Sequence, residues 1–301
     1  TFFKSDSQME SQLEELIHRF AKEGHAGLQN KIAITWIRYD KPNPDQLSGK
    51  GASWASEKMI YPASVIKLFY AIALEAWLQE DIFQEGIEMR NALNKMIQDS
   101  SNDATSLIVD LLTGTTSGPS LSGEAWSKWQ IQRQLINEWL QSLKWPELDG
   151  INCCQKTWND EPFGRERDFY GLGNNNRNSL STSATARMLE AIMTQSIISP
   201  PACKRIKRSL SRSLDIVHRK ANPDNQIDGF IGEGLPIGTL LWNKAGWMSE
   251  VRHDAAWFQQ PKGNPTLLII FCQGRELSKD QFLLPAIANE LSRLNQSKEQ
   301  Q

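Results

Sequence analysis

The sequence predicts a mixed α/β (α+β) fold, in which both ends of the chain build an antiparallel five-stranded sheet flanked by terminal helices. Three observations lead to this prediction. Segments with strand character occur only towards the two ends, helical patterns fill the middle, and an amphipathic helical pattern lies near each terminus. We therefore expect one lobe from residues 1–60 plus 205–301 and an inserted, mostly helical lobe at 61–204.

The terminal parts of the chain supply the expected sheet. Each of its segments is rich in β-branched and other apolar residues and is bounded by turn residues. The predicted strands lie at residues 31–40, 53–55, 238–246, 253–260 and 266–273. Amphipathic helices are predicted at residues 8–23 and 279–294, where they can cover the sheet.

The middle of the chain is predominantly helical. The clearest helical pattern covers residues 124–143. Gly, Asn and Pro then become frequent, which predicts an omega-like surface loop near residues 155–178. A further helix is expected at 181–193, with Ser181 or Thr182 as its N-cap.

The segment at residues 204–220 carries many basic residues and predicts one more helix. Ile206, Leu210 and Val217 recur at helical spacing and give it an inner face. The basic residues therefore indicate a solvated outer face rather than a nucleic-acid surface.

The length and the charge of the chain narrow the range of functions. With 301 residues, the chain can bury a large core as one domain or as two lobes. It has 33 Lys and Arg residues against 35 Asp and Glu residues, and this net charge of −2 argues against nucleic acid or an anionic membrane as the main partner. No apolar run in the sequence is long enough for a membrane span.

The segment YPASVIKLFYAIALEAWL, residues 61–78, predicts a helix with almost no polar face. Ser64 stands at its start and Lys67 follows three residues later, so both side chains project from one face. Free backbone N–H groups at a helix N-terminus favour an alkoxide, and apolar neighbours lower the pKa of a lysine. The pair therefore suits a nucleophile beside a general base, and the alternative is a capping serine beside a lysine whose stem reaches solvent.

Two further short segments accompany this pair. Ser100-Ser101-Asn102 precedes an apolar helix, and Lys244-Ala245-Gly246 ends a predicted strand. Taken in order, SVIK, SSN and KAG resemble the three motifs of the class A β-lactamases and related penicillin-binding serine hydrolases. The stretches SSNDATSLIVDLLTG and NKAGW…VRHDAAWF also resemble the second helix and the edge strands of that family, and the resemblance runs from about Gln8 to Leu294.

This resemblance implies a β-lactamase/transpeptidase-like fold and an acyl-transfer reaction. Ser64 would be the nucleophile that forms the acyl-enzyme, and Lys67 would activate the Ser64 hydroxyl. Ser100 would pass a proton to the departing nitrogen. Asn102 would hold the amide side chain of the substrate. The alternative for the second motif is a simple helix cap.

The resemblance also implies substrate-binding roles around the third motif. The residues concerned are Lys244, Ala245, Gly246, Trp247 and Arg252. Lys244 and Arg252 would attract a substrate carboxylate, and the backbone N–H groups of Ser64 and Trp247 would form an oxyanion hole. Ala245 replaces the usual hydroxyl residue of the family, and Gly246 allows close approach of the ligand. The alternative is a plain strand end with a glycine.

In class A enzymes, a glutamate on the omega loop activates the water that releases the acyl group, and two glutamates are candidates for that role here. Glu161 follows Trp158 by three residues and precedes a proline, which resembles the Trp-Glu-Pro motif of the family's omega loop with two residues inserted. Glu166 lies nearer the position of the family's glutamate when that position is counted back from Arg177. For each, the alternative is a solvated loop carboxylate.

The resemblance thus predicts a serine hydrolase that opens β-lactam amides. The first alternative is a D-alanyl-D-alanine carboxypeptidase, a penicillin-binding-like enzyme or an esterase with slow deacylation, and the second is a non-catalytic binding protein on the same scaffold. We expect a small-molecule or peptidoglycan-derived substrate, no cofactor, no metal and a monomeric state. Export to the periplasm is expected, although the chain begins without a visible signal and a cytoplasmic location is also open. The four cysteines are spaced neither as a disulfide framework nor as a zinc site.

Overall fold

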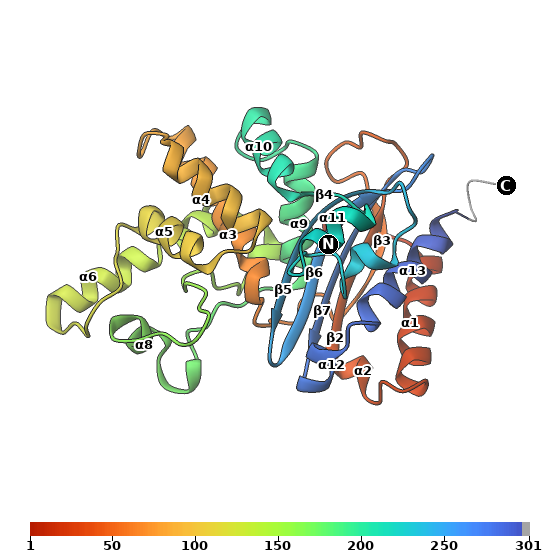
Figure 1. The fold of residues 1–301 in the computed structure, drawn as a ribbon, viewed down its shortest axis with the longest axis horizontal. Coiled ribbons are helices and arrows are strands. Elements are labelled where there is room, and N and C mark those ends of the chain that lie inside the picture. The colour runs from red at the N-terminus through yellow and green to blue at the C-terminus, as the bar shows by residue number, and fades with distance from the viewer. Residues whose placement is uncertain (297–301) are drawn as a thin grey trace. The chain divides into compact units, whose positions relative to one another are not determined.

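The computed structural model describes residues 1–296, and contacts divide the chain into two units (Figure 1). Unit 1 comprises residues 1–60 and the chain from Ser181 onward, and unit 2 comprises residues 61–180. The sequence placed the second boundary at residue 204. In the structure it lies at residue 180, because helix α9 (Thr182–Met193) packs on the sheet of unit 1.

Unit 1 contains a seven-stranded sheet in the order β1-β3-β2-β7-β6-β5-β4. The strands are β1 (Lys4–Ser5), β2 (Ile32–Arg38), β3 (Lys50–Trp54), β4 (Ser211–Arg212), β5 (Leu240–Met248), β6 (Val251–Gln259) and β7 (Pro265–Gln273). The expected five-stranded antiparallel sheet is therefore wrong: β1 and β4 add one strand at each edge, and β1 pairs in parallel with β3. A two-residue strand carries no periodic pattern, so the sequence gives no signal for either of them.

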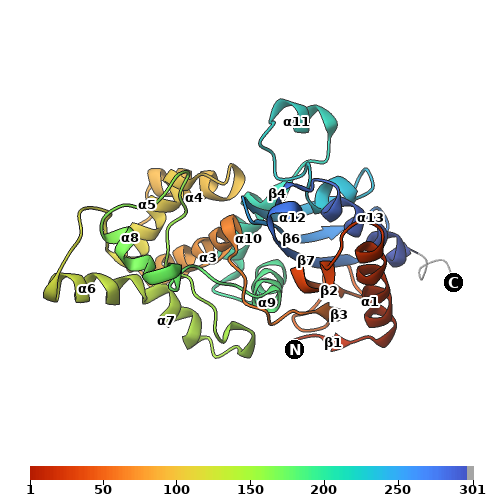
Figure 2. The ribbon, with the colours of Figure 1, turned by 90° about the horizontal axis from the view of Figure 1, so that it is seen from below.

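Helices cover both faces of this sheet. Helices α1 (Ser7–Lys22) and α13 (Leu283–Gln296) lie side by side on one face, and α9 packs on the other (Figures 1 and 2). Strand β2 is therefore buried along nearly its whole length, which explains its largely apolar sequence. The N-cap of α9 is Ser181, whose side chain accepts a hydrogen bond from the N–H of Ala184 at 3.0 Å.

One long helix expected in unit 1 is interrupted, and another begins later than expected. The segment at 204–220 divides into α10 (Pro200–Leu210), β4 and α11 (Ile216–Ala221), and Val217 is exposed rather than inward-facing. The interruption occurs where Ser211 adopts an extended backbone and pairs with β5. The helix expected at 279–294 is α13, which begins at Leu283 because Asp280 accepts hydrogen bonds from the N–H groups of Phe282 and Leu283. The short helix α12 (Arg275–Lys279) precedes it. The remaining elements of unit 1 are α2 (Leu28–Lys31) and η4 (Ile231–Gly234).

Unit 2 is mostly helical and is organised around α3 (Ile66–Gln79), which contacts α4, α5 and α7. Its other elements are η1 (Ala63–Val65), α4 (Ile87–Gln98), α5 (Asn102–Thr113), α6 (Gly123–Arg133), α7 (Leu135–Ser142), η2 (Pro146–Leu148), α8 (Arg165–Tyr170) and η3 (Leu172–Asn174). The single helix expected at 124–143 divides into α6 and α7 at Gln134. There the backbone tightens, and the N–H of Gln134 bonds to the carbonyl of Ile131 three residues back.

One side chain joins the two ends of the omega-like loop at residues 155–178. Asn178 Oδ1 accepts a hydrogen bond from the Gln155 N–H at 2.9 Å, and Asn178 Nδ2 donates to the Gln155 carbonyl at 2.9 Å. The buried amide of Asn178 thus matches the backbone of Gln155 as a neighbouring strand would. Within residues 1–296, no helix has both the length and the apolar character needed to cross a membrane. The four cysteines are buried, and none of them forms a disulfide within residues 1–296.

Candidate active site

Ser64 lies in a single 3₁₀ turn, η1, directly before α3, and is partly exposed. The preceding residue, Ala63, is buried and has a φ of +47°. A non-glycine residue in the left-handed region costs about 1–2 kcal/mol. The turn that presents Ser64 is therefore strained, and the packing around it must hold the strain.

Lys67 is fully buried in the first turn of α3. Its Nζ lies 2.5 Å from the Ser100 carbonyl oxygen, 2.7 Å from Asn102 Oδ1 and 3.2 Å from Ser100 Oγ. Burial disfavours the charged form and lowers the pKa of Lys67 from 10.5 to about 7. The neutral and the charged amine are therefore both populated near neutral pH.

The oxygens around Lys67 decide where the lone pair of its neutral form points. A neutral amine has two N–H groups and one lone pair, and the Ser100 carbonyl and Asn102 Oδ1 can only accept hydrogen bonds. With the two N–H groups used on these oxygens, the lone pair faces the Ser100 hydroxyl. Within residues 1–296, no hydrogen bond joins the Ser64 hydroxyl to Lys67. Ser100 therefore places a hydroxyl within hydrogen-bond distance of the Lys67 amine.

Ser100 and Asn102 come from the turn that leads into α5. Ser100 has a φ of +57°, so a second left-handed residue contributes to the surroundings of Lys67. This conformation lets both its carbonyl oxygen and its hydroxyl reach the amine. Ser101 is the N-cap of α5, because its Oγ accepts a hydrogen bond from the N–H of Ala104 at 3.1 Å.

The sequence analysis did not select two residues that contact Asn102. Thr157 Oγ1 donates to Asn102 Oδ1 at 2.7 Å, and Asn102 Nδ2 donates to Asn159 Oδ1 at 2.7 Å. Asn159 directly follows Trp158, whereas Glu161 stands two residues farther along. The omega-loop motif, read from its tryptophan instead of from its Glu-Pro pair, would have selected Asn159.

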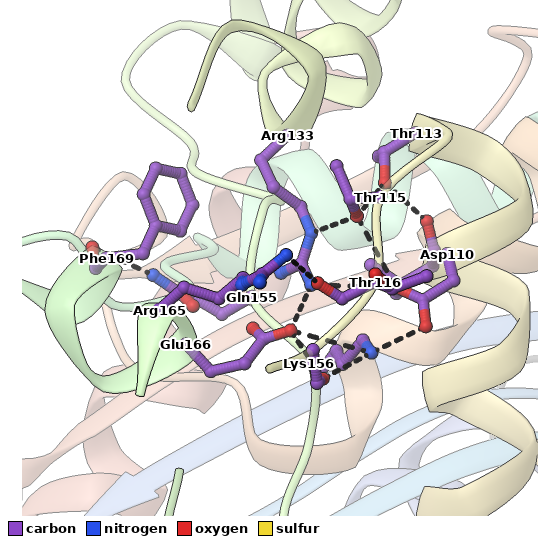
Figure 3. Close-up of polar contacts among 12 residues, drawn as sticks. Asp110, Thr113, Thr115, Thr116, Arg133, Gln155, Lys156, Arg165, Glu166 and Phe169 are labelled. Atoms are coloured by element: carbon purple, nitrogen blue, oxygen red, sulfur yellow. Dashed lines mark hydrogen bonds and ion pairs between the residues drawn. The ribbon is translucent and has the colours of Figure 1, made fainter. Parts of the chain in front are cut away.

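The two predicted glutamates lie in different surroundings. Glu161 is exposed on the loop. Glu166 is buried in α8, where Oε1 accepts from Ser117 Oγ at 2.7 Å, pairs with Arg133, and lies 3.5 Å from Lys156 Nζ (Figure 3). Within residues 1–296, neither glutamate forms a hydrogen bond or an ion pair with Lys67. Oε1 of Glu166 is therefore contacted by two cations and a hydroxyl, whereas its buried Oε2 has no hydrogen-bond partner among residues 1–296.

Glu166 belongs to a buried charge cluster that consists of Asp110, Arg133, Lys156 and Glu166 (Figure 3). Lys156 Nζ lies 2.8 Å from Asp110 Oδ2, and Arg133 Nε donates to Thr115 Oγ1 at 2.7 Å. The cluster contains two cations and two carboxylates, so its charges can balance. Its members come from α5, α6 and the omega-like loop, to which both Lys156 and Glu166 belong, and the cluster therefore ties three segments of unit 2 together.

In unit 1, the third motif lies on β5. Lys244 is fully buried, and its Nζ donates to Gln226 Oε1 at 2.7 Å and to the Ala245 carbonyl at 2.8 Å. The Ala245 side chain belongs to the apolar core beneath α1 and α13. Gly246 pairs with His253 on β6.

Trp247 and Arg252 pair across β5 and β6. The Trp247 ring is 58% exposed, and its Nε1 donates to the Ser278 carbonyl at 2.7 Å. Arg252 is buried, and it donates to the carbonyls of Ser278 at 3.0 Å and Gly229 at 3.3 Å. Its guanidinium also lies 4.9 Å from the ring centre of Phe230 and 5.6 Å from that of Trp247. Arg252 therefore braces neighbouring backbone in this structure.

Comparisons with known proteins agree with the fold. A family model described as "Beta-lactamase enzyme family" matches residues 43–294 of the chain. No curated protein matches it. Similar solved structures include a PBP-A variant in an acyl-enzyme complex with penicillin G (TM-score 0.61, 15% identity, covering 96% of this chain and 98% of that chain). A β-lactamase from Sphaerobacter thermophilus is also similar (TM-score 0.59, 15% identity, covering 90% of this chain and 95% of that chain). So is a β-lactamase from Burkholderia vietnamiensis (TM-score 0.63, 13% identity, covering 93% of this chain and 95% of that chain).

The buried charge cluster predicts a large stability loss when one of its cations is removed. Arg133→Leu leaves two carboxylates with one cation and should lower the free energy of unfolding by about 3–5 kcal/mol. Urea denaturation measures this change. The control Lys95→Ala removes an exposed ion pair with Asp99 and should leave stability nearly unchanged. Equal stability of the Arg133→Leu variant and the wild type would contradict the assignment.

Proposed function

The chain belongs to the β-lactamase enzyme family, and on that premise we propose that it is a serine hydrolase in which Ser64 forms an acyl-enzyme with a β-lactam or related amide. The observation that carries the proposal is the buried amine of Lys67, held against Ser100 and Asn102 one helical turn from Ser64. A pKa of about 7 makes this amine a proton acceptor at neutral pH.

In the proposed acylation, Ser64 attacks the carbonyl carbon and its proton passes to Lys67, whose lone pair turns from Ser100 Oγ towards Ser64 for this step. Residues at i and i+3 of a helical turn are neighbours, which supports this transfer. When the amide C–N bond breaks, Ser100 donates its proton to the nitrogen and takes one from Lys67 in return. The 3.2 Å contact between Lys67 Nζ and Ser100 Oγ supports this second transfer.

Residues of β5 and β6 are proposed to bind the substrate. Lys244 is a buried cation on β5 and would attract a substrate carboxylate. The backbone N–H group of Ser64 would stabilise the oxyanion. Arg252 donates its hydrogen bonds to two backbone carbonyls. We therefore propose that Arg252 stabilises the backbone at this strand end and does not bind the substrate carboxylate.

We further propose that release of the acyl group is slow, as in a penicillin-binding enzyme. Hydrolysis of an acyl-enzyme needs a base that takes a proton from water. The two loop side chains that touch Asn102, Thr157 and Asn159, are neutral and cannot take this proton, and Oε1 of Glu166 is paired with Arg133 and Lys156. The penicillin G adduct of a PBP-A variant supports the view that this fold can hold such an intermediate.

Fast β-lactam hydrolysis is the second candidate function. The description of the family and the β-lactamases among the similar structures favour it. It would require a hydrolytic base, and the exposed Glu161 is the remaining glutamate among the two predicted for this role.

The proposed function predicts a covalent adduct on Ser64. Incubation with penicillin G should raise the intact mass by one whole penicillin molecule, because opening the ring loses no atoms. Ser64→Ala should abolish the adduct, and Ser122→Ala, at an exposed position, should retain it. A wild-type protein that shows neither adduct nor turnover would exclude the enzymatic function and favour a binding protein. Rapid turnover would retain the Ser64 mechanism and contradict slow release.

Slow release also predicts a gain of function at Asn159. Asn159→Glu places a carboxylate beside Asn102 and should speed loss of the adduct on the order of 100-fold. Asn91→Glu adds the same charge on the exposed face of α4 and should change nothing. The decay of the adduct mass over time measures both. If Asn159→Glu has no effect and Glu161→Gln stalls release, Glu161 is the base and the assignment is wrong.

A further inference from the structure

Thr157 links the surroundings of Lys67 to the buried charge cluster. Its hydroxyl donates to Asn102 Oδ1 at 2.7 Å, and the same oxygen accepts from Lys67 Nζ at 2.7 Å. The amide nitrogen of Asn102 is bound in turn by Asn159. The Asn102 side chain therefore has one orientation in which all these contacts are made, and Thr157 is one of its two loop-side partners.

The two residues before Thr157 are held firmly by buried partners. The Gln155 carbonyl accepts a hydrogen bond from the Tyr70 hydroxyl at 2.6 Å. Lys156 is buried, and its Nζ bonds to Asp110 Oδ2 and Ser117 Oγ at 2.8 Å each. Consecutive Cα atoms are about 3.8 Å apart along the chain, so a backbone fixed at residues 155 and 156 leaves the next residue little freedom.

Glu166 is a further polar neighbour that holds the Lys156 side chain in place. Its Oε1 lies 3.5 Å from Lys156 Nζ and accepts from Ser117, the same hydroxyl that Lys156 contacts (Figure 3). Arg133 pairs with the same oxygen. A buried lysine is stable in its charged form only when carboxylates compensate it, so the position of the Lys156 side chain depends on Glu166 and Asp110.

We infer that Thr157 and Glu166 are positioning residues for acylation: Thr157 orients Asn102 so that its oxygen faces Lys67, and Glu166 fixes Thr157 through Lys156. The inference rests on the proposed function, because acylation of Ser64 is its readout. It gives Glu166 a task before the acyl-enzyme forms, whereas a hydrolytic base acts after that point.

The Thr157 hydroxyl is tested with a matched pair of variants. Thr157→Val keeps the shape of the side chain without its hydroxyl, and Thr157→Ser keeps the hydroxyl. Stopped-flow acylation by a chromogenic β-lactam, measured across the neutral pH range, should be slowed on the order of 10- to 100-fold in the valine variant and little in the serine variant. The pH midpoint of acylation should also move to lower pH, because an unfixed Asn102 can turn its NH₂ group towards Lys67 and disfavour the ammonium form.

A variant of Glu166 distinguishes a positioning residue from a hydrolytic base. Glu166→Gln should slow acylation and shift its pH midpoint in the same direction, with the release rate unchanged. Glu124→Gln, at an exposed position on α6, is the control and should alter neither. Thermal melting checks that each variant is folded. If Glu166→Gln does not fold, the comparison of Thr157→Val with Thr157→Ser decides the test.

Two results would overturn the inference. One is acylation by Thr157→Val at the wild-type rate and pH midpoint. The other is a Glu166→Gln variant that acylates normally and then stalls at release, because that pattern identifies a hydrolytic base. Both results require a wild-type protein that acylates, so they are distinct from failure of the proposed function, in which the wild type forms no adduct.

Discussion

The burial of the Lys67 amine against Ser100 and Asn102 is the constraint on which the rest of the site depends. An apolar helix removes water from the amine, and three neutral oxygen contacts replace it. The result is a lysine that exchanges a proton near neutral pH without help from a histidine. Both left-handed residues beside it, Ala63 and Ser100, fit a site in which backbone strain is held in place by packing.

Unit 2 keeps its charged and its neutral polar groups apart. The carboxylate of Glu166 is paired with Arg133 and Lys156, while the oxygens that contact Lys67 are neutral. A carboxylate beside Lys67 would favour the ammonium form and raise the pKa of the amine. The separation therefore favours the neutral form of the Lys67 amine, which is the form that the proposed acylation requires.

The sequence predicted the features that depend on local patterns. The spacing of Ser64 and Lys67 and the apolar character of their helix were sufficient to select both residues, and the helix that Ser181 caps was found from its capping signal. Features set by distant contacts were not predictable. Thr157 touches Asn102 across 55 residues of chain, and Glu166 meets Arg133 across 33. The edge strands β1 and β4 were missed because two residues hold no period, and their pairing partners decide their conformation.

The protonation state of Lys67 is the central claim, and NMR titration of its side chain tests that claim most directly. The protein is labelled at the lysine Nζ and Cε positions, and the signal that disappears in Lys67→Arg identifies the residue. We predict that this signal titrates at a pKa of about 7, so that the neutral amine predominates above that pH. A Lys67 signal that titrates near the ordinary lysine value of 10.5 would contradict the account.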